Sequence, residues 1–109
     1  MYLDNLGEVI AIRELFVLLE RNEKKKVTVF IGKPRPFSDA DGYYCPFQIV
    51  GIGGEEIKYA AGIDAIQSLQ LVMIILGATL QFLNDQVGGS LRWEGSTGGD
   101  LGFPSTSNN

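Results

Sequence analysis

The chain has 109 residues, of which 45% are hydrophobic and 20% charged, as in a globular protein with a single core. Its net charge of -4 would repel a nucleic-acid backbone unless the basic groups were gathered on one face. There is no histidine and only one cysteine, Cys45, which excludes an intramolecular disulfide and the commonest general base and zinc ligand. We expect one domain over residues 1–104 and a flexible tail over residues 105–109.

Targeting and surface-binding signals are weak. The chain does not start with a basic stretch followed by an apolar one, as a signal peptide does. The longest apolar run, Leu71–Ala78, is far shorter than the roughly 20 residues of a membrane span. The basic run from Arg21 to Lys26 is interrupted by Glu23 and is typical of a solvated hairpin tip. We expect a cytoplasmic protein that binds neither nucleic acid nor membrane and uses no metal or cofactor.

Residues 9–20 form a long apolar stretch of ambiguous type. Its glutamate, leucine and arginine residues favour a helix, whereas its valine and isoleucine residues favour a strand. The next segment, Val27–Ile31, alternates like a strand and lies at hairpin distance. We therefore predict a strand over residues 9–20, and finding a helix there would exclude the predicted meander.

The second strand is predicted to end at Gly32, because Pro34 and Pro36 lack the backbone donor that a sheet needs. A loop follows, and Tyr43–Val50 then has the aromatic and β-branched residues of a third strand. Pro46 interrupts this strand, which predicts an edge position or a bulge.

A glycine-rich turn over residues 51–54 leads to a short fourth strand over residues 57–63. Asp64 is a good helix N-cap, and Gln67 three positions later completes a pattern resembling a capping box. We predict a helix over residues 64–84. The predicted fold is therefore α+β, a four-stranded antiparallel meander with one long C-terminal helix packed on it and a fold-back segment after the helix.

The predicted helix has two apolar faces rather than one. A helical projection places one set of apolar residues together: Ile66, Leu69, Met73, Leu76, Gly77, Leu80 and Leu83. A second set lies roughly opposite: Leu71, Ile74, Ile75, Ala78 and Phe82. A helix on a two-layer sheet buries only one face, so another element must cover the second. The candidates are the chain's own segment with Leu91, Trp93, Leu101 and Phe103, or another subunit.

No set of residues indicates catalysis. Cys45 lies in an apolar strand without a histidine partner, which favours a buried structural role. The glycines of residues 51–54 lack the third glycine and the helix of a dinucleotide-binding loop. Asp39, Asp41 and Asp64 lack the spacing of a calcium loop. We predict that the protein is not an enzyme and has no catalytic or metal-binding residues.

One polar cluster is a candidate ligand site: Lys33, Arg35, Tyr43 and Tyr44. Flanking prolines restrict the backbone around Lys33 and Arg35, and the next strand begins with the two tyrosines. Two cations beside aromatic rings could hold an anion or a carboxylate. The alternative is structural, with an internal salt bridge to Asp39 or Asp41 and aromatic packing.

A succession of short motifs spans nearly the whole chain: Ile-Gly-Lys-Pro-Arg-Pro (31–36), Tyr-Cys-Pro-Phe (44–47), Gly-Ile-Gly (51–53), Gly-Ile-Asp (62–64) with Gln67, Leu69, Gln70 and Leu71, then Leu91 with Trp93, and Asp-Leu-Gly-Phe-Pro (100–104). Their order and spacing resemble a family of small bacterial proteins of unknown function. The resemblance implies a stand-alone bacterial domain and brings no activity, substrate or catalytic residue. Its Leu-Gly-Phe-Pro ending suggests that Leu101 and Phe103 are structural, which favours the fold-back cover.

Two functions follow from these features. The first is a non-enzymatic protein-interaction module, either a homodimer or the partner of another bacterial protein, because the helix is apolar on both faces. Self-association is expected through this helix or through the first strand. The alternative is a small-ligand or anion-binding protein that uses the loop with Lys33 and Arg35.

Overall fold

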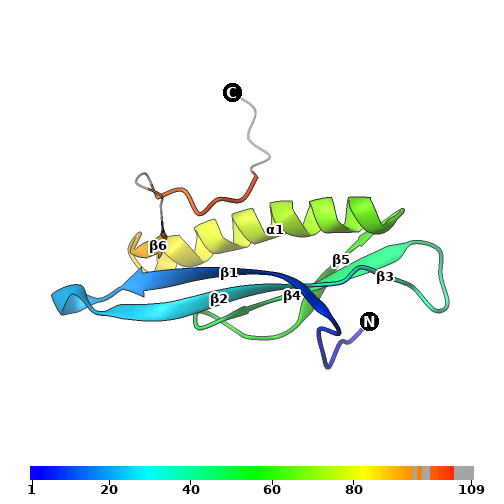
Figure 1. Ribbon diagram of the computed structural model, residues 1–109, viewed down its shortest axis with the longest axis horizontal. Coiled ribbons are helices and arrows are strands. Elements are labelled where there is room, and N and C mark those ends of the chain that lie inside the picture. The colour runs from blue at the N-terminus through cyan, green and yellow to red at the C-terminus, as the bar shows by residue number, and fades with distance from the viewer. Residues whose placement is uncertain (95, 97–98, 105–109) are drawn as a thin grey trace.

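In the computed structural model, which describes residues 1–94, 96 and 99–104, an antiparallel sheet carries one long helix on one face (Figure 1). Among these residues the sheet has six strands, and a one-turn 3-10 helix, Glu20–Asn22, closes the first hairpin. The elements are β1 (Val9–Leu18), β2 (Lys24–Gly32), β3 (Arg35–Pro36), β4 (Tyr43–Val50), β5 (Lys58–Gly62), α1 (Ala65–Gln86) and β6 (Leu91–Trp93). The α+β class is confirmed, but the prediction of four strands was wrong. Strands β3 and β6 are too short to show an alternating pattern.

Strand β1 resolves the ambiguity of residues 9–20 in favour of a strand. It pairs with β2 from Leu18, opposite Lys24, to Val9, opposite Gly32, with a register shift between Val9 and Ala11. Its inward side chains Leu15 and Val17 are buried by this pairing. Burial of β-branched and leucine side chains on a sheet face outweighs the modest helical preference of the intervening glutamate and arginine residues.

Strand β4 lies inside the sheet, with partners on both edges. Strand β2 pairs with Phe47–Val50 and β3 pairs with Tyr43 and Tyr44, while β5 pairs with residues 43–47 along the other edge. The prediction that Pro46 marks an edge or a bulge was therefore wrong. Pairing stops at Phe47 on the first edge and resumes at Tyr44, so the proline lies opposite the break between β2 and β3. An interior strand tolerates proline there because no ladder partner faces it on that edge.

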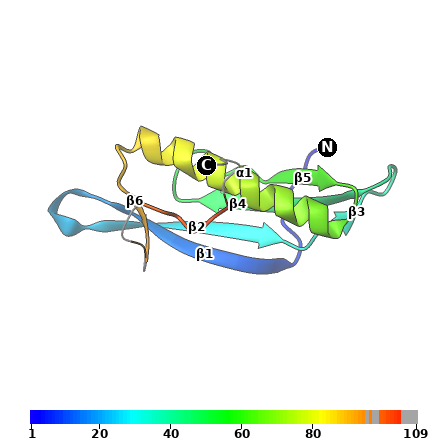
Figure 2. The ribbon, with the colours of Figure 1, turned by 90° about the horizontal axis from the view of Figure 1, so that it is seen from above.

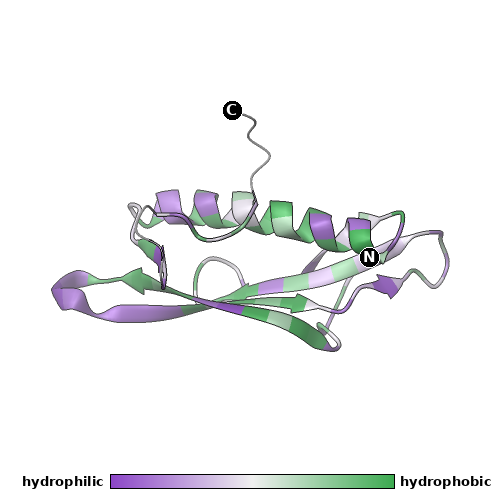
Figure 3. Cartoon of the chain, turned by 45° about the horizontal axis from the view of Figure 1, so that its top comes forward, coloured by the Kyte–Doolittle hydropathy of each residue, from purple (hydrophilic) through white to green (hydrophobic). Residues whose placement is uncertain are grey.

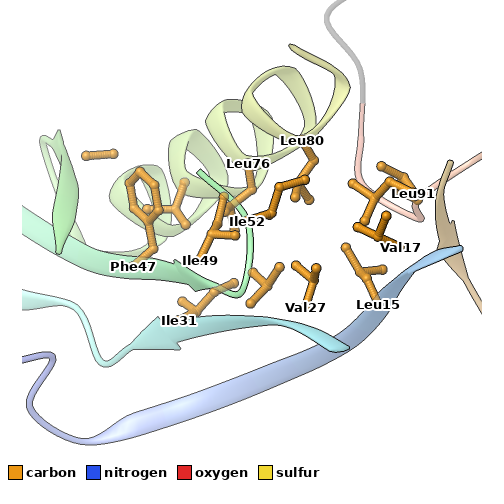
Figure 4. Close-up of a cluster of buried hydrophobic side chains, with 14 of the residues drawn as sticks. Leu15, Val17, Val27, Ile31, Phe47, Ile49, Ile52, Leu76, Leu80 and Leu91 are labelled. Carbon is orange, nitrogen blue, oxygen red and sulfur yellow. The ribbon is translucent and has the colours of Figure 1, made fainter. Parts of the chain in front are cut away.

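The core lies between the sheet and α1. Alternate residues of the strands point toward the helix, and their buried side chains meet those of the helix (Figure 4). The sheet contributes Leu15, Val17, Val27, Val29, Ile31, Cys45, Phe47, Ile49, Ala60 and Leu91, and α1 contributes Val72, Leu76 and Leu80. Ile52, from the loop after β4, and Leu101, from the C-terminal end, complete the cluster.

Helix α1 begins as the sequence predicts. The Asp64 carboxylate accepts from the Gln67 backbone N–H at 2.8 Å, and the Gln67 side chain accepts from the Ile63 N–H at 2.7 Å. These bonds form a capping box shifted by one residue, because the reciprocal donor is Ile63 rather than Asp64 itself. The helix ends at Gln86, two residues later than predicted, and the buried side chain of Asn84 accepts from the Leu91 N–H at 2.9 Å. This bond links the helix end to β6.

Residues 99–104, the C-terminal segment, fold back over the sheet beside α1 (Figure 2). Leu101 is buried, and Trp93 and Phe103 pack against the core. At Gly77 a Cβ would lie 2.8 Å from the Pro104 carbonyl oxygen, so the close crossing requires a glycine in the helix. The fold-back cover is confirmed for this flank of α1. The predicted flexible tail, residues 105–109, lies outside the described residues.

Candidate functional site

The four residues proposed as a ligand site are only partly brought together. Arg35 of β3 lies directly opposite Tyr44 of β4, and its Cζ lies 5.1 Å from the centre of the Tyr44 ring. Tyr43 is the next residue along the same strand, so it points to the opposite face of the sheet. The Lys33 side chain is exposed, and its backbone N–H donates to the Glu8 carbonyl at 2.8 Å. The pair that forms a site is therefore Arg35 with Tyr44.

Two further aromatic residues join this pair. The Phe37 ring centre lies 5.1 Å from that of Tyr44, and the Tyr59 ring centre lies 6.0 Å from it. The Phe37 and Tyr59 rings are 6.4 Å apart and nearly perpendicular. Such tilted and edge-on arrangements are the favourable ones for aromatic rings. Sequence reasoning missed both residues. Tyr59 reaches this face only through the pairing of β5 with β4, which the sequence pattern does not show.

The guanidinium of Arg35 is packed without a matching acceptor. Its Nε and Nη2 atoms are closed to water and have no hydrogen-bond partner among the described residues. No carboxylate in that part of the chain forms a salt bridge with Arg35. A Cβ on Gly7 would lie 3.2 Å from Cζ and 3.4 and 3.5 Å from Nη2 and Nη1, so Gly7 lies over the flat face of the guanidinium. The aromatic packing expected of a structural arginine is present, whereas the expected salt bridge to Asp39 or Asp41 is not formed.

A second arginine, Arg13 of β1, also packs against aromatic rings, but its guanidinium has hydrogen-bond acceptors. Its Nη1 donates to the carbonyl of Gly102 at 2.8 Å and to that of Leu101 at 3.2 Å. Its Cζ lies 4.1 Å from the Trp93 ring centre and 4.7 Å from that of Phe103. Sequence reasoning missed this residue, since its partners are nearly ninety positions away. Arg13 is structural, because these contacts join β1 to Trp93 of β6 and hold the C-terminal segment, residues 99–104, on the sheet.

Two further features of the described residues bear on chemistry, the thiol of Cys45 and a hollow beside α1. Cys45 is fully buried, its Sγ donates to the Gly32 carbonyl at 3.3 Å, and burial raises the pKa of its thiol to about 11. A thiol with so high a pKa is a poor nucleophile at neutral pH. A hollow of about 320 Å³ separates α1 from the C-terminal segment, and Asp100 is the one ionisable residue among its described lining. The described residues contain no group of three or more potential metal ligands.

The outer face of α1 is apolar and partly exposed. It consists of Leu71, Ile74, Ile75, Ala78 and Phe82, the second face predicted from the sequence. Phe82 is 61% exposed and Ile75 is 37% exposed, while Ile74 lies beside Pro104 of the C-terminal segment. Residues 65–84 contain no charged side chain, and Figure 3 shows hydrophobic positions between the polar ones along α1. By length and composition alone the helix could cross a membrane.

The comparison with known proteins gives a family but no activity. A family model described as a domain of unknown function (DUF6968) matches residues 11–105. The chain belongs to this family. The DUF6968 match begins within β1 and includes the rest of the sheet, α1 and the C-terminal segment, while residues 1–10 lie outside it. The resemblance to a family of unknown function is therefore confirmed. No curated protein and no solved structure matches the chain.

Proposed function

We propose that this protein is a non-enzymatic interaction module that forms a homodimer through the outer face of α1. The observation that carries the proposal is the absence of any charged side chain over residues 65–84 on a helix with exposed Ile75 and Phe82. A surface helix in contact with water normally has charged residues on its outer face. Depletion of charge together with exposed aromatic and aliphatic side chains is instead the composition of an interface core.

The spacing of the outer face supports a helix as its partner. Leu71, Ile75, Ala78 and Phe82 recur at intervals of four, three and four residues, which is the seam spacing of paired helices. Among the described residues, the C-terminal segment crosses α1 at Gly77, and the hollows beside it reach Leu71 and Ala78. The other two seam residues, Ile75 and Phe82, are exposed.

The same seam fits a second copy in an antiparallel arrangement. A two-fold axis between residues 75 and 78 places Phe82 opposite Leu71 of the second copy, and Ile75 opposite its Ala78. Large side chains thus face smaller ones, as close packing requires. The arrangement also brings Asp85 near the first turn of the other helix, where the helix dipole favours a negative charge. A parallel pairing would place the two Asp85 carboxylates together.

The chemistry of the chain supports a role without catalysis. There is no histidine in the sequence, and the only cysteine is buried with a raised pKa. The chain therefore has no histidine to act as a base, and its one thiol is a poor nucleophile. Recognition through apolar packing needs neither group.

Sedimentation velocity of Phe82→Glu tests the dimer. The wild-type chain is expected to sediment as a dimer at high micromolar concentration and the variant as a monomer, because a carboxylate would be buried in the seam. Ile66→Glu is the matched control, since Ile66 is 68% exposed and lies on another side of the same helix. The control should remain dimeric.

Two results would contradict the proposal. One is a wild-type chain that stays monomeric throughout the concentration range. The other is a monomer that co-sediments with phospholipid vesicles and loses this property in Phe82→Glu, because the outer face would then bind a membrane rather than a second copy.

A further inference from the structure

The guanidinium of Arg35 lies on the side of the sheet that faces away from α1, and two of its nitrogen atoms have no hydrogen-bond partner among the described residues. Cys45 and Phe47 point toward α1 and are buried there, so Tyr44 and its cross-strand neighbour Arg35 point the other way. Figure 1 shows the start of the chain on this same side of the sheet. The feature is therefore separate from the proposed dimer face.

The two unpartnered atoms of Arg35 form one edge of its guanidinium. An arginine stays charged at all physiological pH values, and a buried charged donor without an acceptor is strongly unfavourable. The Nε–H and Nη2–H groups are adjacent and nearly parallel, which is the geometry that receives two oxygens of one carboxylate or phosphate. Within the described part of the chain no side chain or carbonyl oxygen bonds this edge.

The N-terminal segment, residues 1–7, covers this guanidinium and is weakly held. Its hydrogen bonds among the described residues are internal: Gly7 N–H donates to the Asn5 side chain at 2.9 Å, and Asn5 donates to Asp4 at 3.1 Å. Leu3 and Leu6 are half-buried, so apolar contacts hold the segment on the sheet. The first backbone bond to the sheet comes later, at Glu8.

We propose that Arg35 binds the carboxylate or phosphate group of a small molecule, and that residues 1–7 are a displaceable cover over this site. Two oxygens of the oxyanion accept hydrogen bonds from Nε–H and Nη2–H in a bidentate contact. The Tyr44 ring lies beside the guanidinium, and the rings of Phe37 and Tyr59 pack against Tyr44, so the cluster offers an apolar surface to the body of the ligand. Displacement of the cover exchanges a few apolar contacts for two charge-assisted hydrogen bonds.

The side-chain Nε–H resonance of Arg35 in a nitrogen-15 NMR spectrum reports directly on this contact. The full chain is titrated with inorganic phosphate and, separately, with benzoate, with sodium chloride keeping the ionic strength constant. We expect a saturable shift of the Arg35 resonance with at least one of the two anions. Tighter binding of benzoate than of phosphate would show that the aromatic rings contact the apolar part of the ligand. Binding of phosphate alone would show that the site recognises only the oxyanion.

Three variants sharpen the test. Arg35→Gln should abolish the saturable shifts that Tyr44 shows during the titration, and Arg35→Lys should weaken binding by about tenfold, because an ammonium cannot donate in a bidentate way. Arg21→Gln, at the exposed hairpin tip, should leave the affinity unchanged. Gly7→Ala should raise the affinity by at least about fivefold, because Gly7 has a φ of 69° and its added Cβ would press on Arg35, which loosens the cover.

The outcomes separate the two parts of the proposal. If neither anion gives a saturable shift, or if the shifts persist in Arg35→Gln, there is no oxyanion site at Arg35. If binding is saturable but Gly7→Ala leaves its affinity unchanged or lowers it, the site stands and the cover does not. The monomeric Phe82→Glu variant should bind with wild-type affinity, since α1 lies on the other side of the sheet.

Discussion

Arg13 and Arg35 have similar neighbours but differ in their hydrogen-bond acceptors. Each guanidinium lies against an aromatic ring of a strand and beneath a glycine from a terminal segment. The glycine is Gly102 over Arg13, with a φ of 81°, and Gly7 over Arg35, with a φ of 69°. Arg13 donates to two carbonyl groups of its segment, whereas Nε and Nη2 of Arg35 have no acceptor among the described residues.

The difference separates a structural arginine from a candidate binding residue. A charged donor placed in a protein for packing is normally satisfied by the chain itself, as Arg13 is by the C-terminal segment. The surroundings of Arg35 provide the ring and the glycine but not the acceptor. Stability measurements on the two residues should therefore differ in size and in sign.

Arg13→Ala should give the largest loss, about 3 kcal/mol in the free energy of unfolding, because two hydrogen bonds from a charged group and the contacts with two rings disappear together. Urea denaturation followed by the fluorescence of Trp93, the only tryptophan, measures it. Arg21→Ala, at the exposed hairpin tip, is the control and should change stability by less than about 0.5 kcal/mol. Equal losses in the two variants would show that Arg13 does not hold the C-terminal segment.

Gly102→Ala should destabilise the fold by about 2 kcal/mol, because the residue has a left-handed backbone and its Cβ would meet the ring of Trp93 and the guanidinium of Arg13. The same urea titration measures this loss. Gly99→Ala provides the matched comparison, since Gly99 also has a positive φ but a Cβ there meets no described residue within 4 Å. The excess loss of Gly102→Ala over Gly99→Ala reports the contact with Arg13 and Trp93, and no excess would argue against that contact.

Arg35→Met should have the smallest effect and the opposite sign, raising stability by up to about 1 kcal/mol, because it removes two buried donor atoms without partners and keeps the apolar stem of the side chain. Thermal unfolding in chloride buffer, without phosphate or carboxylates, is the measurement. A loss of several kcal/mol would mean that Arg35 is satisfied within the folded chain. The contrast with Arg13 would then disappear.

Most of the fold could be predicted from local pattern. Alternation identified β2 and β5, aromatic and β-branched residues identified β4, and Asp64 with Gln67 identified the start of α1. These signals depend on neighbouring residues only. The outcome at Pro46 could not be predicted, since a proline is tolerated in an interior strand only where a neighbouring strand is interrupted. That interruption is a property of two strands together.

The candidate site was predictable only in part. Prolines on either side of Arg35 and the tyrosines that follow pointed to the right place in the sheet. Tyr43 and Tyr44 are neighbours on one strand and therefore point to opposite faces of the sheet, and the pairing of β5 with β4 brings Tyr59 to the face of Tyr44. Gly7 lies nearly thirty residues before Arg35, and no pattern within either segment indicates that they meet.

The sequence by itself determined the class of this fold, the two apolar faces of its helix and the absence of histidine chemistry, because composition and periodicity act through near neighbours. Only the tertiary structure decided which flank of α1 the C-terminal segment covers and which of two similar arginines has acceptors. Those outcomes depend on contacts between segments far apart in the chain. A buried polar group needs a hydrogen-bond partner, and a local sequence pattern does not show which distant segment supplies it.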